Sequence, residues 1–186
     1  MIRRNPGLPT IISIHDYLSN AGERRASPAI DHHAVDPRDN NPQMVWDKLI
    51  SHHDQIFMVL CGHQYAQAMR IDANRHGHKV YQILSDYQGR NQTAKDAGAT
   101  MSRGQGIGDG WMRLMTFDMA APTPLVRVHT YSTHYKRLGS HTPTYAAWYK
   151  AQEKPQLSDA AFLGTDDFTI DLDDFRARFD RTARTR

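Results

Sequence analysis

The chain has 186 residues, 39% of them hydrophobic, and a formal net charge of +3. This length suits one domain with a hydrophobic core, the single cysteine excludes an internal disulfide, and no stretch approaches the length of a membrane-spanning helix. The isoelectric point near 9.1 comes largely from arginines close to the two ends of the chain, which we interpret as solvated ends.

The first two predicted strands are apolar runs that each end in histidine. Residues 10–15 read Thr-Ile-Ile-Ser-Ile-His, and residues 56–63 read Ile-Phe-Met-Val-Leu-Cys-Gly-His. Between them, a helix is predicted with Asn41 as its N-cap and Pro42 in its first turn, and its apolar stripe runs from Val45 to Ile50 and reaches His53. This β-α-β order predicts two parallel strands in one sheet. His15 and His63 are then expected at the carboxyl edge of the sheet, where two neutral imidazoles can bind a metal ion.

A long polar loop is expected over residues 16–41, and the second half of the chain is predicted to be rich in strands. Strands are expected over 79–85, 111–117 and 125–131, of which the last two can form a hairpin. A glycine-rich connector is expected over 89–110, and its last part, Arg103–Gly110, resembles a phosphate-binding loop only superficially. No Gly-Lys-Ser/Thr follows it, and the next element is predicted to be a strand rather than a helix.

The last part of the chain is polar and shows no clear periodicity. We therefore predict a main domain over residues 1–135 and an irregular C-terminal extension over 136–186. Within the extension, a short strand is expected over 168–172 and a short helix over 173–179.

Each candidate ligand also has a plain structural interpretation. His63 is either a metal ligand or a hydrogen-bonded histidine at the end of a strand. Cys61 precedes it by two residues, where a thiol nucleophile with a histidine base is conceivable, but a buried strand cysteine is favoured. His76-Gly77-His78 has a chelating spacing, yet its charged surroundings favour a solvated turn. Asp86 and Asp109 can approach a metal, with surface carboxylates as the default interpretation.

Several stretches, taken in order, resemble a bacterial branch of the calcineurin-like metallophosphoesterases. They are Ser13–Leu18, Trp46–Leu49, Ile56–His63, Gln82–Gln88, Gly108–Leu114 and Thr130–Ser132. The resemblance covers about residues 8–135 and implies an α/β fold, as part of a four-layer α/β/β/α sandwich with a mixed, β-rich sheet. It also implies a two-metal site that hydrolyses phosphomonoesters or phosphodiesters. By this resemblance, His15 and His63 ligate the same one of two divalent ions, which would be manganese, iron or zinc.

The chain departs from the family pattern in two ways. The Asp-x-His, Gly-Asp and Gly-Asn-His motifs lie upstream in the family and have no counterpart here, so the bridging aspartate, the asparagine ligand and the catalytic histidine are missing. The Gly-His-x-His of the family is Gly62-His63-Gln64-Tyr65 in this chain. Tyr65 thus occupies the position of a ligand to the other metal, and a phenol with a pKa near 10 is a poor ligand at neutral pH. We expect an incomplete metal site, no catalytic residue and an inactive isolated chain.

Three functions are compatible with these features. The first is a truncated or split metallophosphoesterase homologue, which would bind a phosphoester substrate once an upstream half completes the site. The second is a non-catalytic binding module that keeps the half-sandwich fold. The third, a nucleic-acid binder, is disfavoured because the chain lacks an aromatic and basic stripe. We expect no membrane partner. Residues 1–6 lack the apolar core of a signal peptide, so the chain as written is expected in the cytoplasm, with export of a parent protein as the alternative.

Overall fold

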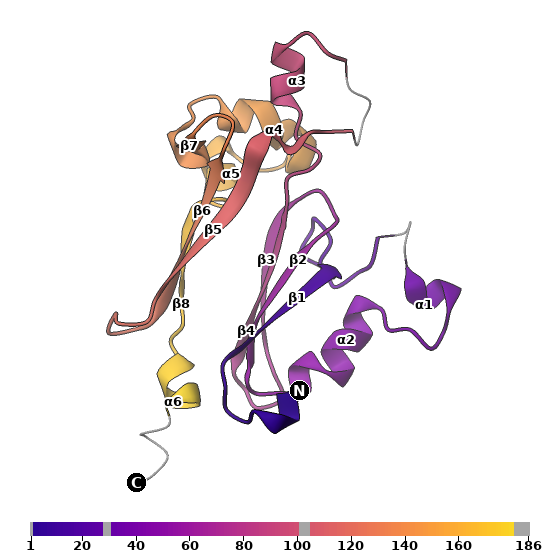
Figure 1. The fold of residues 1–186 in the computed structure, drawn as a ribbon, viewed down its shortest axis with the longest axis vertical. Coiled ribbons are helices and arrows are strands. Elements are labelled where there is room, and N and C mark those ends of the chain that lie inside the picture. Colours follow the sequence, from indigo (N-terminus) through magenta and orange to yellow (C-terminus); the bar gives the residue numbers. More distant parts are fainter. Residues whose placement is uncertain (1, 28–30, 101–104, 181–186) are drawn as a thin grey trace. The chain divides into compact units, whose positions relative to one another are not determined.

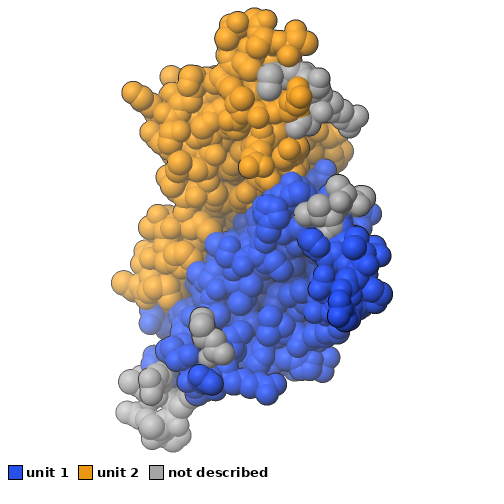
Figure 2. Space-filling view, turned by 45° about the vertical axis from the view of Figure 1, so that its right-hand side comes forward, with its two compact units in different colours: residues 1–64, 68–84, 172–186 blue, residues 65–67, 85–171 orange. Residues whose placement is uncertain are grey.

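A computed structural model describes residues 2–27, 31–100 and 105–180, which form a mixed α/β structure with two sheets. The chain divides into two compact units that interleave along the sequence (Figure 2). Unit 1 comprises residues 1–64, 68–84 and 172–186, and unit 2 comprises residues 65–67 and 85–171.

The sheet of unit 1 is built around parallel strands (Figure 1). Its strands, in spatial order, are β1 (Thr10–Asp16), β2 (Ile56–Gly62), β4 (Lys79–Asp86) and β3 (Ala66–Ala73). β1 pairs with β2 in parallel, and β2 pairs with β4 in parallel. The parallel arrangement expected from the β-α-β order is confirmed, and β1 forms one edge of the sheet.

The connection between β1 and β2 contains the predicted helix. Helix α2 (Pro42–Lys48) is followed by the 3₁₀ turn η2 (Ile50–His52), so the regular helix is shorter than expected. The Asn41 side chain accepts a backbone N–H in the first turn, which is the predicted cap. Trp46 and Ile50 are buried against β2 and β4 in the core of unit 1. Two further short elements of this unit are η1 (Ile2–Arg4) and α1 (His32–Val35).

Strand β3 is absent from the elements that we predicted. Its residues 68–73 alternate between half-buried and exposed positions, and two of the exposed ones, Met69 and Ile71, are apolar. A strand is predicted when apolar and polar residues alternate along it, and apolar residues on the exposed face weaken this alternation. The alternation of Ala68, Arg70 and Asp72 on the half-buried side is the signal that could have revealed it.

The C-terminal helix α6 (Phe175–Phe179) belongs to unit 1. The guanidinium group of Arg178 is buried and donates hydrogen bonds to the backbone carbonyls of Asp54, Ile56 and Lys79. The ring of Phe57 also packs edge-on against Phe175. The interpretation of the C-terminal arginines as a solvated end is therefore wrong for Arg178, because its side chain ties the helix to the base of the sheet.

The sheet of unit 2 is antiparallel and centred on β6 (Leu125–Ser132). β6 pairs with β5 (Trp111–Asp118), with β7 (Arg137–Leu138) and with β8 (Phe168–Asp171). The predicted hairpin of β5 and β6 is confirmed, as is the late strand. Short helices complete the unit: α3 (Gln92–Asp96), η3 (Gly108–Gly110), η4 (Gly139–His141), α4 (Tyr145–Glu153) and α5 (Asp159–Leu163).

The aromatic core of unit 2 joins segments on both sides of residue 135. Trp111 packs edge-on against Tyr145, with ring centroids 4.8 Å apart, and Tyr149 and Phe162 complete the cluster. The structure thus groups 136–171 with the preceding strands and 172–186 with unit 1, which differs from the division that composition suggested. In the parts of the chain that the structure describes, no helix is long and apolar enough to cross a membrane.

Candidate functional site

The structure brings His15 and His63 together at the carboxyl ends of β1 and β2. Their ring centroids lie 4.8 Å apart and the ring planes are inclined by 59°. His15 is exposed and His63 is half-buried. This proximity is the one expected from two adjacent parallel strands that both end in histidine.

Irregular backbone presents both imidazoles. The pairing of β1 with β2 shifts register between Ile14 and Asp16, on either side of His15, and such irregularities re-aim side chains at strand ends. His63 has a φ of 68°, in the left-handed region, where a residue with a Cβ is strained. Strained residues of this kind concentrate at functional sites, so the backbone supports a functional interpretation of the pair.

Replacing His63 with glycine is expected to raise the free energy of unfolding by about 0.5–1 kcal/mol, because glycine adopts a positive φ without the Cβ clash. Urea denaturation followed by circular dichroism measures the change. His15→Ala is the matched control, since it removes the same ring contact at a residue without a positive φ. If His63→Gly destabilises the chain as much as His15→Ala does, the ring contact outweighs the backbone strain.

The two residues next to the histidines hold the adjacent loop in place. The Asp16 carboxylate accepts hydrogen bonds from the Gln64 side chain, at 2.8 Å, and from the backbone N–H of Ser27, at 2.6 Å. The same Gln64 amide donates to the carbonyl of Arg25 at 2.8 Å. Asp16 and Gln64 were not among the predicted site residues, because such loop contacts leave no periodic signal in a sequence. Each carboxylate oxygen of Asp16 thus accepts one hydrogen bond, which fixes the orientation of the group.

His15 and His63 together offer two imidazole donors to a metal ion. Among the residues that the structure describes, no group of three or more histidine, cysteine, aspartate or glutamate side chains is placed to hold a metal ion. A zinc ion in a catalytic site has three protein ligands and one open position. The residues present thus fit two positions around one ion.

Tyr65, the degenerate ligand position, belongs to unit 2, whereas both histidines belong to unit 1. Its side chain is 43% exposed. The ring lies against Gly89: a Cβ atom at that glycine would come within 3.0 Å of it. The role of this position in metal binding stays a prediction.

Cys61 is not an activated nucleophile. The side chain packs against the core of unit 1, and its thiol donates a hydrogen bond to the carbonyl of Ile83. Burial raises the pKa of the Cys61 thiol to about 12, so the thiolate is scarcely populated at neutral pH. The preferred interpretation, a structural cysteine in a strand, is supported, with the side chain partly buried.

His76 and His78 form part of the turn between β3 and β4, as expected. The Asn74 side chain accepts the backbone N–H groups of both histidines, which fixes the turn. Nδ1 of His78 lies 2.7 Å from the Asp54 carboxylate, whereas Nε2 of His76 faces the carbonyl of His52 at 3.4 Å. The two imidazoles thus have separate partners, and this supports a structural role.

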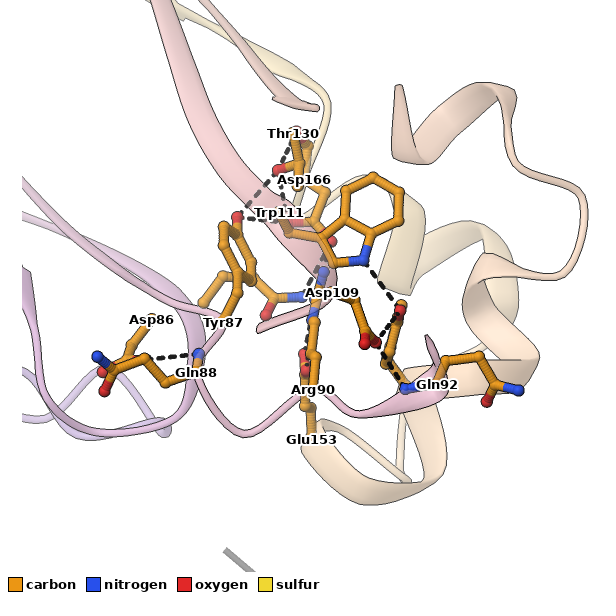
Figure 3. Close-up of polar contacts among 12 residues, drawn as sticks. Asp86, Tyr87, Gln88, Arg90, Gln92, Asp109, Trp111, Thr130, Glu153 and Asp166 are labelled. Atoms are coloured by element: carbon orange, nitrogen blue, oxygen red, sulfur yellow. Dashed lines mark hydrogen bonds and ion pairs between the residues drawn. The ribbon is translucent and has the colours of Figure 1, made fainter. Parts of the chain in front are cut away.

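Asp86 and Asp109 are buried in unit 2, so the expectation of surface carboxylates is wrong for both. Asp86 accepts the backbone N–H of Gln88 (Figure 3). Asp109 accepts the backbone N–H groups of Gln92 and Thr93 at the start of α3, and it also accepts the hydroxyl of Tyr149. These hydrogen bonds give both carboxylates a structural role in holding the local backbone.

The described end of the glycine-rich connector is packed rather than open. A Cβ at Gly106 would lie 2.2 Å from the carbonyl oxygen of Gln88, so only glycine fits there. The backbone N–H groups of Ile107 and Gly108 both donate to the carbonyl of Arg90. These donors are therefore unavailable to a phosphate. Arg103 and Gly104 lie outside the described residues.

Unit 2 also contains a buried cluster of charged side chains that the sequence did not reveal (Figure 3). Arg90 pairs with Glu153, at 2.7 Å, and lies 3.7 Å from Asp166. Arg113 pairs with Asp166 at 2.9 Å. Tyr87 donates to the same carboxylate, and burial raises the pKa of this phenol to about 12. Two cations thus face two anions, and the balance of charge indicates a structural cluster.

Comparison of the chain with protein-family models, with curated proteins and with solved structures finds no match.

Proposed function

We propose that this chain is part of a metal-dependent phosphoester hydrolase of the calcineurin-like metallophosphoesterase type, in which His15 and His63 supply two ligands to one metal ion. The single observation that carries the proposal is the convergence of the two imidazoles at adjacent parallel strand ends, with centroids 4.8 Å apart. The order of the family-like sequences from residue 8 to residue 135 supports it.

The separation of the rings suits one shared ion. A bound imidazole nitrogen lies about 2.1 Å from zinc, so a tetrahedral angle places two such nitrogens about 3.4 Å apart. The centres of the rings then lie about 5 Å apart by the same geometry, close to the observed 4.8 Å. His15 and His63 would hold the ion, while Asp16 and Gln64 fix the neighbouring loop through hydrogen bonds to its backbone.

The rest of the site is proposed to come from a segment with the Asp-x-His, Gly-Asp and Gly-Asn-His motifs. That segment would also complete the four-layer α/β/β/α sandwich. In a complete site, a metal pair activates water and stabilises the charge on the phosphate oxygens. The described residues of this chain contribute metal binding and loop positioning, and none is assigned a catalytic role.

The isolated chain is expected to show no turnover of nitrophenyl phosphate or bis-nitrophenyl phosphate with manganese, iron or zinc. Supplying the motif-bearing segment, as a fused or co-expressed chain, should produce metal-dependent hydrolysis that His63→Ala abolishes. His76→Ala is the control, because that histidine lies in the turn between β3 and β4. Activity of the isolated chain that depends on His63, or reconstituted activity that survives His63→Ala, would contradict the proposal. A complex without activity would favour the binding module.

A further inference from the structure

We propose that the His15–His63 pair binds zinc between two copies of this chain, which gives a zinc-bridged homodimer with four imidazole ligands. The inference rests on the metal-binding part of the proposed function, but it requires neither hydrolysis nor a further segment.

A second copy of the chain would supply the ligands that one copy lacks. Zinc in closed sites is tetrahedral and takes four protein ligands. His15 and His63 fill two positions, and among the described residues no group of three or more histidine, cysteine, aspartate or glutamate side chains is placed to hold a metal ion. Two positions on the ion therefore remain open. A second copy related by a two-fold axis through the ion offers the same pair of imidazoles, as an isologous interface requires.

His15 is exposed and lies on the edge strand of the sheet of unit 1, where a second copy would approach. No described strand pairs with the outer edge of β1. Side chains alternate between the two faces of a strand, so Ile11 lies on the same face of β1 as His15. The side chain of Ile11 is 42% exposed. A copy bound through the metal can cover this apolar side chain. The Asp16 carboxylate beside the pair would offset part of the charge of the ion.

The other histidine pair with chelating spacing is already engaged. His78 faces Asp54, and His76 faces the carbonyl of His52. Zinc would have to displace these contacts, whereas the ring-to-ring contact of His15 with His63 already has the spacing of two ligands on one ion. His76 is therefore the natural control for the dimer.

Sedimentation of the full chain with and without zinc tests the proposal. The expected result is a mass that doubles from 21.2 kDa on adding zinc, with one zinc ion per two chains by elemental analysis, and that returns to 21.2 kDa in EDTA. His15→Ala and His63→Gly should stay monomeric in zinc, with circular dichroism as the check on folding. His76→Ala should dimerise like the unmodified chain.

Several results would overturn the dimer. These are a monomer that binds one zinc ion per chain, a dimer that persists in EDTA or in His15→Ala, and dimerisation that His76→Ala removes. The outcome is separable from the proposed function. A chain that stays monomeric in zinc, but gains His63-dependent hydrolysis with the motif-bearing segment, refutes the dimer alone. A zinc-bridged dimer with no hydrolysis on reconstitution refutes the hydrolase alone.

Discussion

Replacing Asp166 with alanine is expected to lower the free energy of unfolding of unit 2 by about 3–5 kcal/mol, because removal of one partner leaves buried charges and donors unpaired. The Asp166 side chain is 1% exposed and lies between two guanidinium groups. Its carboxylate also accepts hydrogen bonds from neutral groups. The donors are Gln67, Tyr87, Thr130 and Tyr145. A loss of this size is a large share of the whole stability of a domain, which is about 5–15 kcal/mol, so the packing of unit 2 should loosen.

Asp167→Ala is the matched control for this prediction. The neighbouring carboxylate pairs with His129 at 2.9 Å, but both side chains are about one-third exposed, so its loss should cost no more than about 1 kcal/mol. Near-UV circular dichroism and urea denaturation report the difference. Equal losses in Asp166→Ala and Asp167→Ala would mean that the buried cluster does not hold unit 2 together.

Replacing Tyr65 with histidine is expected to give the largest functional change in the reconstituted protein. If position 65 is a ligand of the second metal, an imidazole should raise the metal content from one ion towards two. Hydrolysis should increase by about a hundredfold, since one ion contributes several kcal/mol of charge stabilisation and each 1.4 kcal/mol is a factor of ten in rate. Elemental analysis and nitrophenyl ester hydrolysis measure the two effects.

Tyr65→Phe distinguishes metal binding by the phenol oxygen from packing of the ring. Phenylalanine keeps a ring that can lie against Gly89, but it has no oxygen. Metal content and turnover should therefore match those of the tyrosine form. If the tyrosine form already holds two ions and turns over as fast as Tyr65→His, the phenol is a competent ligand or the position is not a ligand.

The His15–His63 pair could be predicted because it depends on a general rule of topology. Two apolar strands separated by one helix become adjacent and parallel, so the residues that end them share one edge of the sheet. The contact between Asp16 and Gln64 could not be predicted in the same way. It depends on the path of a loop of irregular conformation, and neither residue stands in a periodic pattern.

The buried charged cluster of unit 2 could not be predicted from the sequence, for a different reason. Arg90 and Glu153 are 63 residues apart, and neither stands out among the charged residues of the chain until the fold joins them. Helix α4 was also missed, although Tyr145 and Tyr149 are spaced by four and both are buried on one face. Residues 145–149 read Tyr-Ala-Ala-Trp-Tyr, so the apolar stripe of this helix is visible in the sequence itself.

The binding of one metal ion by His15 and His63 is the central claim, and paramagnetic NMR tests it most directly. The chain has 11 histidines, so the ring signals can be followed together during a titration with manganese and assigned with His15→Ala and His63→Gly. The account predicts that the signals of His15 and His63 broaden first and in parallel, and that either variant removes the effect at the remaining ring. Broadening that begins at His76 and His78, or that affects only one ring of the pair, would contradict it.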